Sequence, residues 1–311
     1  AALWGFRPRR GFWIALGVAF RALATIDSVP ALAWHRLLEI RGGARRDERV
    51  HHFLIHARLQ VARYLPGHAF QVGRHAVTRQ QPTARGKVPH SVLGAAATCE
   101  AVGMIAGAAG LACLGLGAAF QRDGGLSIGL PNLGDAVPAA VLTWAPWAAL
   151  ALVMLIPWAV ARLAGTRLLP GVAAHRPVDS FGVYALYGLY FACHGLAFGL
   201  FLTLVHDSGA SWAATLFAGA AALPLAWVIG YLTPATPAGA GAVEAVLVAV
   251  LGARFGAVEV LVAALGFRFA SIAGHGLLAL LASWQSHRFS RSRPAEASPS
   301  APTIAPSRAI P

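Results

Sequence analysis

The sequence predicts an all-α, polytopic membrane protein built as one membrane domain. Of its 311 residues, 57% are hydrophobic and only 12% are charged. Several apolar runs exceed the roughly 18 residues that suffice for a helix to cross a bilayer. Outside these runs, no window has the pattern that a separate globular core would require. We expect about six to eight transmembrane helices, with broken or re-entrant helices near residues 50–80 and 233–251.

The charge distribution favours membrane topology over nucleic-acid binding. The formal net charge of +13 is carried almost wholly by arginine, and Lys87 is the single lysine. The cations cluster between the apolar runs and in the tail, where basic residues orient spans and meet anionic lipid head groups. We therefore expect membrane association and no nucleic-acid partner.

The chain divides into a membrane domain and a tail. Residues 1–285 contain the apolar runs and form the expected helical membrane domain. Residues 286–311 are basic and rich in Pro and Ser, a composition that cannot bury a core, so we expect a disordered tail. Methionine occurs only at positions 104 and 154, so we expect the sequence to begin after processing or truncation, and an earlier span could be missing.

The elements follow from the apolar runs in order. Residues 11–40 are apolar but contain charged side chains and Pro30, which predicts one kinked span or a broken pair. Residues 41–88 hold too many cations for a lipid-exposed span, so we expect interfacial or re-entrant helices that lie against the bundle. Regular spans are predicted at residues 92–120, 139–163, 181–205, 212–232 and 256–284, with a short helix at 241–251.

The stretch YLTPATPAGAGAVEA, residues 231–245, separates two apolar runs. Pro234 and Pro237 lack a backbone donor and clash with the preceding turn, so the helix before them ends near Leu232. Thr236 followed by Pro237 is typical of an N-cap and a first helical residue. A helix N-terminus with unpaired N–H groups attracts anions. The alternative is a tight buried turn whose glycines allow close packing, and both interpretations stay open.

A second interruption lies in ARYLPGHAFQVGRHAVTRQ, residues 62–80. Pro66 and Gly67 break an apolar piece there, and Arg74 and Arg79 follow. Paired Pro/Gly-interrupted segments in a membrane protein point to a substrate site at a repeat interface. Residue matching does not reveal a repeat in this chain. The two interruptions together therefore predict a substrate site where they meet.

Four ionisable residues lie in or near apolar runs: Arg74, Glu100, Glu244 and Arg268. A charge in hydrocarbon costs about 2.5 to 3.5 kcal/mol even on the lenient insertion scale, so we expect these groups to face the bundle interior and to pair. One interpretation is that they only neutralise one another and fix helix register. The other is a polar path for a lipid head group, in which arginine grips phosphate through its planar fork.

Other patterns favour structural roles. His52 and His56 are spaced i, i+4, but no H-E-x-x-H motif is present and the surroundings look interfacial. Tyr190 belongs to a tyrosine series at helical spacing that is typical of packing or of an aromatic belt, and His194 is typical of a core hydrogen-bonding residue. No nucleotide-binding or catalytic motif occurs. We expect no metal, no cofactor and no catalytic residue.

These motifs together resemble one family. TPATPAGAGAVEA is similar to the Pro-Gly-Gly-x-Gly-x-x-Glu signature of the lysylphosphatidylglycerol synthase transmembrane-region (flippase-like) family, with Ala238 where a glycine is usual. RYLPGHAFQVGR, AATCEAVGMIAG and GFRFASI resemble that family's upstream Leu-Pro-Gly segment, glutamate-bearing span and late arginine. Order and spacing agree along most of residues 33–281.

The resemblance implies a membrane domain that translocates lipids or lipid-linked sugars between leaflets of the bacterial inner (cytoplasmic) membrane. Only the membrane domain is matched, without the soluble aminoacyl-transferase domain, so aminoacylation of phosphatidylglycerol is not expected. The implied substrate is an anionic phospholipid or a polyprenyl-linked lipid. The motifs give these candidate substrate-binding residues: Arg63, Tyr64, Pro66, Gly67, Arg74, Glu100, Pro234, Pro237, Gly239, Gly241, Glu244 and Arg268.

Three functions from different classes stay open. The first is a flippase-like transporter or scramblase, which requires a polar cavity at the two interruptions. The second is a catalytically silent scaffold for a partner glycosyltransferase or lipid-modifying enzyme; the protein partners left open are such an enzyme or further copies of this chain. The third is an intramembrane lipid-headgroup transferase, which requires an acid or base poised by its neighbours; Glu100 or Glu244 could serve. We expect a transporter rather than an enzyme.

Overall fold

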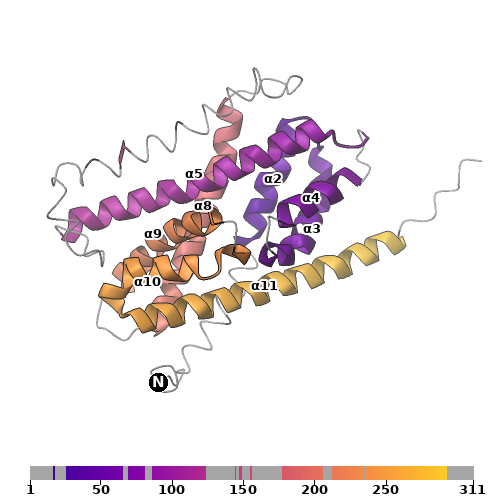
Figure 1. The fold of residues 1–311 in the computed structure, drawn as a ribbon. Helices are drawn as coiled ribbons and strands as arrows, with labels where there is room; N and C mark the ends of the chain where they lie inside the picture. Colours follow the sequence, from indigo (N-terminus) through magenta and orange to yellow (C-terminus); the bar gives the residue numbers. More distant parts are fainter. Residues whose placement is uncertain are drawn as a thin grey trace, which may run out of the picture.

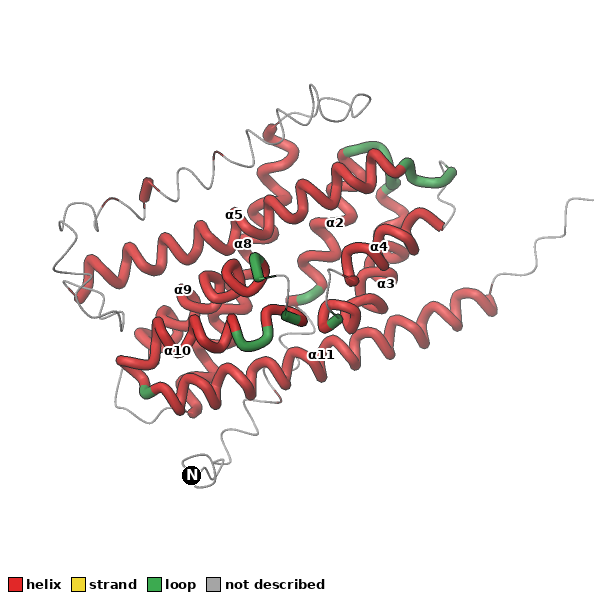
Figure 2. Tube along the Cα trace, in the orientation of Figure 1, coloured by secondary structure: helices red, strands yellow, loops and turns green. Residues whose placement is uncertain are grey.

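The computed structural model describes residues 26–65, 69–80, 86–123, 177–205, 212–233 and 236–292, together with a few isolated positions. All regular elements in these ranges are helical (Figures 1 and 2). The elements are α2 (Ser28–Ile40), η2 (Arg46–Glu48), α3 (Arg49–Leu59), η3 (Gln60–Tyr64), α4 (Ala69–Gln80), α5 (His90–Asp123), α8 (Pro177–Val205), α9 (Trp212–Tyr231), η5 (Pro237–Gly239), α10 (Ala242–Phe255) and α11 (Ala257–Ser292).

Within the part of the chain that the structure describes, five helical stretches are long and apolar enough to cross a membrane: His90–Gly115, Gly182–Val205, Trp212–Tyr231, Pro237–Phe255 and Ala257–Ser286. The chain is thus a multi-pass, all-helical membrane protein, and the predicted fold class is confirmed. The predicted span at residues 139–163 lies almost wholly outside the described residues, as do the first part of the run at 11–40 and residues 293–311 of the predicted tail.

Several helix boundaries differ from expectation, among them the ends of α10 and α11. The helix predicted as short, at residues 241–251, continues as α10 to Phe255, where Gly256 takes a positive φ of 85° and ends it. At the other end of the chain, α11 continues to Ser292, so residues 286–292 of the predicted tail are helical. Polar residues that follow a long apolar helix add one backbone hydrogen bond each, which extends the helix without a new nucleation step.

The long helices α5 and α11 run along opposite sides of the bundle (Figure 1). Between them lie two groups of helices. The early group comprises α2, α3, η3 and α4, and the late group comprises α8, α9, η5 and α10. Helix α5 packs against members of both groups, and so does α11. The two long helices therefore hold the groups together.

Small residues allow the helices of the late group to cross closely. A Cβ atom built on Gly219 of α9 would lie 2.4 Å from the Cα of Gly199 on α8, so neither position has space for a side chain. Close backbone approach of this kind is the usual basis of helix packing in membranes. Large side chains fill the remaining core, and Tyr187, Phe191, Phe198, Phe201 and Leu202 of α8 are all buried.

Candidate functional site

The late interruption begins where α9 ends, at Tyr231, one residue before the predicted end. Helix η5 starts at Pro237 after Thr236, whose φ of −111° and ψ of 132° are extended, as expected for the residue before proline. Ala238 then takes a left-handed conformation, with φ 49° and ψ 33°. This is the position where the resembled family usually has glycine, and a left-handed alanine costs roughly 1–2 kcal/mol. The predicted N-cap at Thr236 and first helical residue at Pro237 are therefore confirmed, whereas the left-handed Ala238 was not predicted.

Two charged side chains satisfy this irregular backbone. Glu244 Oε2 accepts the N–H of Gly241 at 2.8 Å, and its other oxygen forms an ion pair with Arg268 of α11. Arg268 also donates to the carbonyls of Ala238, at 2.8 Å, and Pro237, at 3.3 Å. Contacts of this kind let non-helical backbone exist at membrane depth. The expectation of unpaired amides is therefore wrong at Gly241, because Glu244 accepts that N–H.

The early interruption places Arg63 and Tyr64 in η3, while Pro66 and Gly67 lie outside the described residues. Arg63 donates to the hydroxyl of Tyr190 at 3.3 Å, and its guanidinium lies over the ring of Phe70, 4.7 Å from the centroid. No carboxylate of the described residues lies within ion-pair distance of Arg63. Tyr64 contacts His275 of α11, with 2.7 Å between Oη and Nδ1.

Arg74 of α4 and Glu100 of α5 form a buried ion pair. Arg74 Nη1 lies 2.8 Å from Glu100 Oε1, and the second guanidinium nitrogen contacts Oε2, so the planar fork is fully engaged. The guanidinium also lies over the ring of Trp34, 3.8 Å from its centroid. Arg74 is 1% exposed. This residue joins α2, α4 and α5, and both of its terminal nitrogens are bound to Glu100, while Nε is shielded from solvent without a hydrogen-bond partner.

Two cavities lie where the early and late groups meet. The first has a volume of about 130 Å³ and the second about 150 Å³. Both exceed by far the roughly 10–15 Å³ that one buried water requires, so both have room for water and small polar groups. Arg63, Trp227, Ala238 and Val243 line both cavities. Since Arg63 belongs to η3 and Ala238 to η5, the two interruptions meet here.

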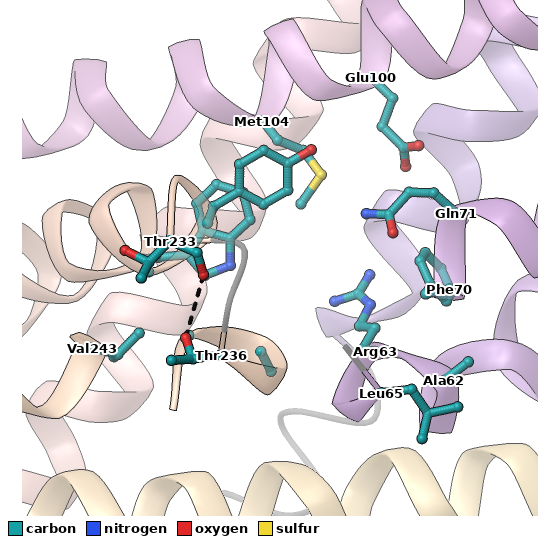
Figure 3. A pocket seen from close by; sticks show the side chains of 15 residues that line it. Ala62, Arg63, Leu65, Phe70, Gln71, Glu100, Met104, Thr233, Thr236 and Val243 are labelled. Carbon is teal, nitrogen blue, oxygen red and sulfur yellow. Dashed lines mark hydrogen bonds between the residues drawn. The ribbon is translucent and has the colours of Figure 1, made fainter. Parts of the chain in front are cut away.

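The first cavity is bounded by polar groups from both helix groups (Figure 3). Arg63, Gln71 and Glu100 lie on the side of η3, α4 and α5, and Thr233 and Thr236 lie across from them. The hydroxyl of Thr236 donates to the carbonyl of Thr233 at 3.3 Å. Arg63 is the cation of this cavity, and Glu100 is its carboxylate, already paired with Arg74.

The second cavity is more aromatic and carries more positive charge. Phe191, Phe267 and the tyrosines of positions 64 and 190 form its apolar and hydroxyl surface. Arg63 and Arg268 supply two guanidinium groups against the single carboxylate of Glu244. In each cavity the carboxylate is paired with another guanidinium, Glu100 with Arg74 and Glu244 with Arg268, so the cation that an anion meets in both is Arg63.

The structure divides the sequence-derived candidates into three sets. Lining the cavities are Arg63, Tyr64, Glu100, Gly239, Glu244 and Arg268. Three residues support the site without lining it: Arg74 through its pair with Glu100, and Pro237 and Gly241 through backbone contacts to Arg268 and Glu244. Pro66, Gly67 and Pro234 lie outside the described residues. The two pairs Arg74–Glu100 and Arg268–Glu244 confirm the expected pairing of the ionisable groups.

Sequence reasoning missed several residues of the second cavity. Tyr190 and His194 read as packing residues, and His275 was not singled out, yet all three line this cavity. Asp27, which contacts His275, is 1% exposed. Asp27 and His275 could have been found, because an ionisable residue inside an apolar run is by default a candidate for function.

Burial shifts the pKa values of several side chains on α3 and η3. It lowers the pKa of His52 on α3 to about 4, and the neighbouring His35 adds to this effect. The pKa of His56 lies well below its usual value for the same reason, with Arg74 contributing. Burial raises the pKa of the Tyr64 hydroxyl. Tyr64 is therefore a neutral hydroxyl beside Arg63 at neutral pH, able to donate or accept.

Comparison with known proteins leaves the family open. No protein-family model matches the chain, and no curated protein matches it. The resemblance to the lysylphosphatidylglycerol synthase transmembrane region stays a prediction that rests on the motifs and their order.

Proposed function

We propose that this protein is a flippase-like membrane protein of the bacterial inner membrane that binds the head of an anionic phospholipid or a lipid-linked sugar and translocates it between leaflets. The observation that carries the proposal is Arg63. It lines both cavities at the junction of the two helix groups and has no carboxylate partner among the described residues. A guanidinium in this position binds phosphate through charge-assisted hydrogen bonds.

The surrounding groups support a path rather than a single closed pocket. Arg63, Trp227, Ala238 and Val243 are shared by the two cavities, so a head group that leaves one cavity stays within reach of the same cation in the other. The polar lining on either side replaces the hydration that the head group loses. The apolar helices around the cavities are suited to contact the lipid chains.

The test is lipid movement in liposomes that contain the purified protein. Labelled phosphatidylglycerol and a labelled polyprenyl phosphate are added in separate experiments, and Arg63→Ala is compared with wild type. Loss of a charge-assisted contact worth about 1.5–3 kcal/mol should slow transfer by about 10-fold to 100-fold. Arg63→Lys should recover part of the rate because it restores the charge without the planar fork.

Arg58→Ala is the matched control. Arg58 is an exposed arginine on the neighbouring helix α3, and it lines neither cavity, so its removal should leave the rate within about twofold of wild type. If wild type moves neither lipid, transport is excluded and the scaffold role for a lipid-modifying or glycosyltransferase partner is favoured. If Arg63→Ala matches wild type, the proposed path is wrong.

A further inference from the structure

Three polar side chains form a chain that leads into the second cavity. Asp27, at the start of α2, contacts His275 Nε2 on α11 at ion-pair distance. On the other side of the ring, His275 Nδ1 lies 2.7 Å from the hydroxyl of Tyr64 on η3. Asp27 is 1% exposed and His275 5% exposed, whereas Tyr64 is half-buried. Both His275 and Tyr64 line the second cavity, so the chain runs from a buried carboxylate to the cavity surface.

The protonation state of His275 decides what the Tyr64 hydroxyl presents to the cavity. In a neutral ring that carries its proton on Nε2, the nitrogen in contact with Asp27, Nδ1 is an acceptor and the Tyr64 hydroxyl donates to it. The cavity then faces a lone pair of the Tyr64 oxygen. In an imidazolium, Nδ1–H donates to that oxygen instead, and the Tyr64 O–H is released to donate into the cavity. Protonation of His275 therefore changes the Tyr64 hydroxyl from an acceptor into a donor towards the cavity.

An anion in the second cavity binds less tightly when His275 is neutral than when it is protonated. A lone pair of Tyr64 repels it, whereas the Tyr64 O–H donates to it beside the guanidinium of Arg63. We propose that Asp27, His275 and Tyr64 form a proton switch that couples the binding of an anionic head group in the second cavity to the uptake of one proton by His275. This inference rests on the proposed function, because it needs an anion in that cavity. It adds a coupling ion, the proton, to the transport cycle.

The groups around His275 allow both states. Those that face it from the neighbouring elements are Asp27 at the start of α2, His56 on α3, Arg63 and Tyr64 on η3, and Tyr190 and His194 on α8. The carboxylate of Asp27 contacts the ring, and Arg63 lines the same cavity. An anion bound in this cavity attracts an imidazolium at His275, so anion binding and protonation of His275 favour each other. Arg268 and Glu244 line the same cavity as a pair and add little net charge.

A second buried group marks the same cavity as a place for a ligand. His194 Nδ1 is shielded from solvent and has no hydrogen-bond partner among the described residues. A buried polar atom of this kind requires a partner, which a head group or a bound water in the second cavity would supply. His194 therefore lies where an anion held by Arg63 and Tyr64 could also be contacted.

The experiment counts protons directly. Isothermal titration calorimetry of the full chain in detergent with dihexanoyl phosphatidylglycerol, repeated in buffers of different ionisation enthalpy, gives the number of protons taken up per lipid bound. Wild type should take up close to one proton at pH values above the titration of the empty site. Its affinity should fall about tenfold per pH unit over that range.

Two variants and one control make the result decisive. His275→Gln should bind the lipid with no proton uptake and with an affinity independent of pH. Tyr64→Phe removes the hydroxyl that changes roles and should also flatten the pH profile; it serves if His275→Gln does not fold. His90→Gln, an exposed histidine outside both cavities, should behave as wild type.

The outcomes separate the two proposals. Binding by wild type without proton uptake overturns the switch and leaves the proposed function standing. Equal proton uptake by wild type and by His275→Gln or Tyr64→Phe overturns the switch as well. Absence of binding by wild type at every pH overturns both. Proton uptake that both variants abolish, and that His90→Gln retains, supports the switch.

Discussion

At the scale of single residues, the two arginines of the early interruption have different environments and hence different roles. Arg74 meets a carboxylate, an imidazole and two aromatic rings in a closed setting. Arg63 meets a hydroxyl and one ring, and it borders two cavities. A cation whose charge is already compensated stabilises the fold, whereas one that lacks a carboxylate partner is available to an anionic ligand.

Removing one partner of the Arg74–Glu100 pair should destabilise the protein strongly. Arg74→Ala or Glu100→Gln leaves the other charge buried and uncompensated, which costs about 3–5 kcal/mol. Unfolding in detergent monitored by circular dichroism measures this loss. Replacing both residues together, as Arg74→Met with Glu100→Leu, should cost less than either single change. A double variant less stable than Arg74→Ala would contradict this account.

The control for that series is Arg36, which pairs with Glu39 on the surface of α2. The Arg36 side chain is 45% exposed, so Arg36→Ala should cost less than about 1 kcal/mol.

Acid should destabilise the protein through His52. Its pKa in the folded protein is about 4, against 6.5 for an ordinary histidine. The unfolded chain therefore binds a proton that the folded chain does not. The contribution of His52 to the free energy of unfolding is constant above about pH 6.5. It falls by on the order of 3 kcal/mol in total as the pH drops towards 4. Melting temperatures of wild type and His52→Gln between pH 7 and 4 should converge as the pH falls.

At the scale of elements, the interruption between α9 and α10 depends on contact between two glycines. A Cβ atom built on Gly239 would lie 2.8 Å from the Cα of Gly230, and Gly239 also has a positive φ of 68°. Gly239→Ala should therefore separate η5 from α9 and strain the turn, with a loss of about 1–3 kcal/mol. Thermal unfolding measures the loss.

Gly276→Ala is the matched control for this prediction. Gly276 is helical in α11, and a Cβ atom there would meet nothing within 4 Å. Alanine should leave stability unchanged or raise it by up to about 1 kcal/mol. Equal behaviour of the two variants would show that the contact between η5 and α9 does not limit stability.

The elements also show how far sequence reasoning reaches. The ends of the helices around the late interruption were predictable, because proline and glycine act on the backbone of their own neighbours. The pairing of Glu244 with Arg268 was also predictable, because an unpaired charge in an apolar setting is too costly. These features need only local chemistry or a simple balance of charge.

The sequence did not predict that Arg63, rather than Arg74, lines the cavities. Arg63 lies in the short 3-10 helix η3, whose three residues per turn rotate its side chain relative to an α-helical expectation. The contact between Asp27 and His275 joins elements at opposite ends of the chain, and no local pattern records it. The packing of η3 against α11 brings Tyr64 to His275, and Asp27 reaches the same ring from the start of α2.

At the scale of the whole molecule, the cavities lie where two groups of helices meet; α5 and α11 pack against both groups, and α2 also packs directly against α8. The early group contributes Arg63, and the late group contributes the polar backbone turn at Ala238. A site at such a boundary changes shape when the groups move relative to one another, which is how many transporters expose a fixed site alternately to the two leaflets. The five apolar stretches found among the described residues have the length and composition to span a membrane around this boundary.

An anionic lipid should therefore stabilise the whole fold, and the effect should depend on Arg63. A ligand that binds only the folded state adds RT ln(1 + [L]/Kd), or about 2.7 kcal/mol at a concentration of 100 Kd. In neutral detergent, short-chain phosphatidylglycerol should raise the melting temperature of wild type by several degrees. Short-chain phosphatidylcholine should raise it less, because its zwitterionic head group is a poorer partner for an unpaired guanidinium. Arg63→Ala should remove the difference between the two lipids, whereas Arg58→Ala should keep it. Equal shifts with both lipids in wild type would indicate general solvation of the apolar surface and would contradict a head-group site at Arg63.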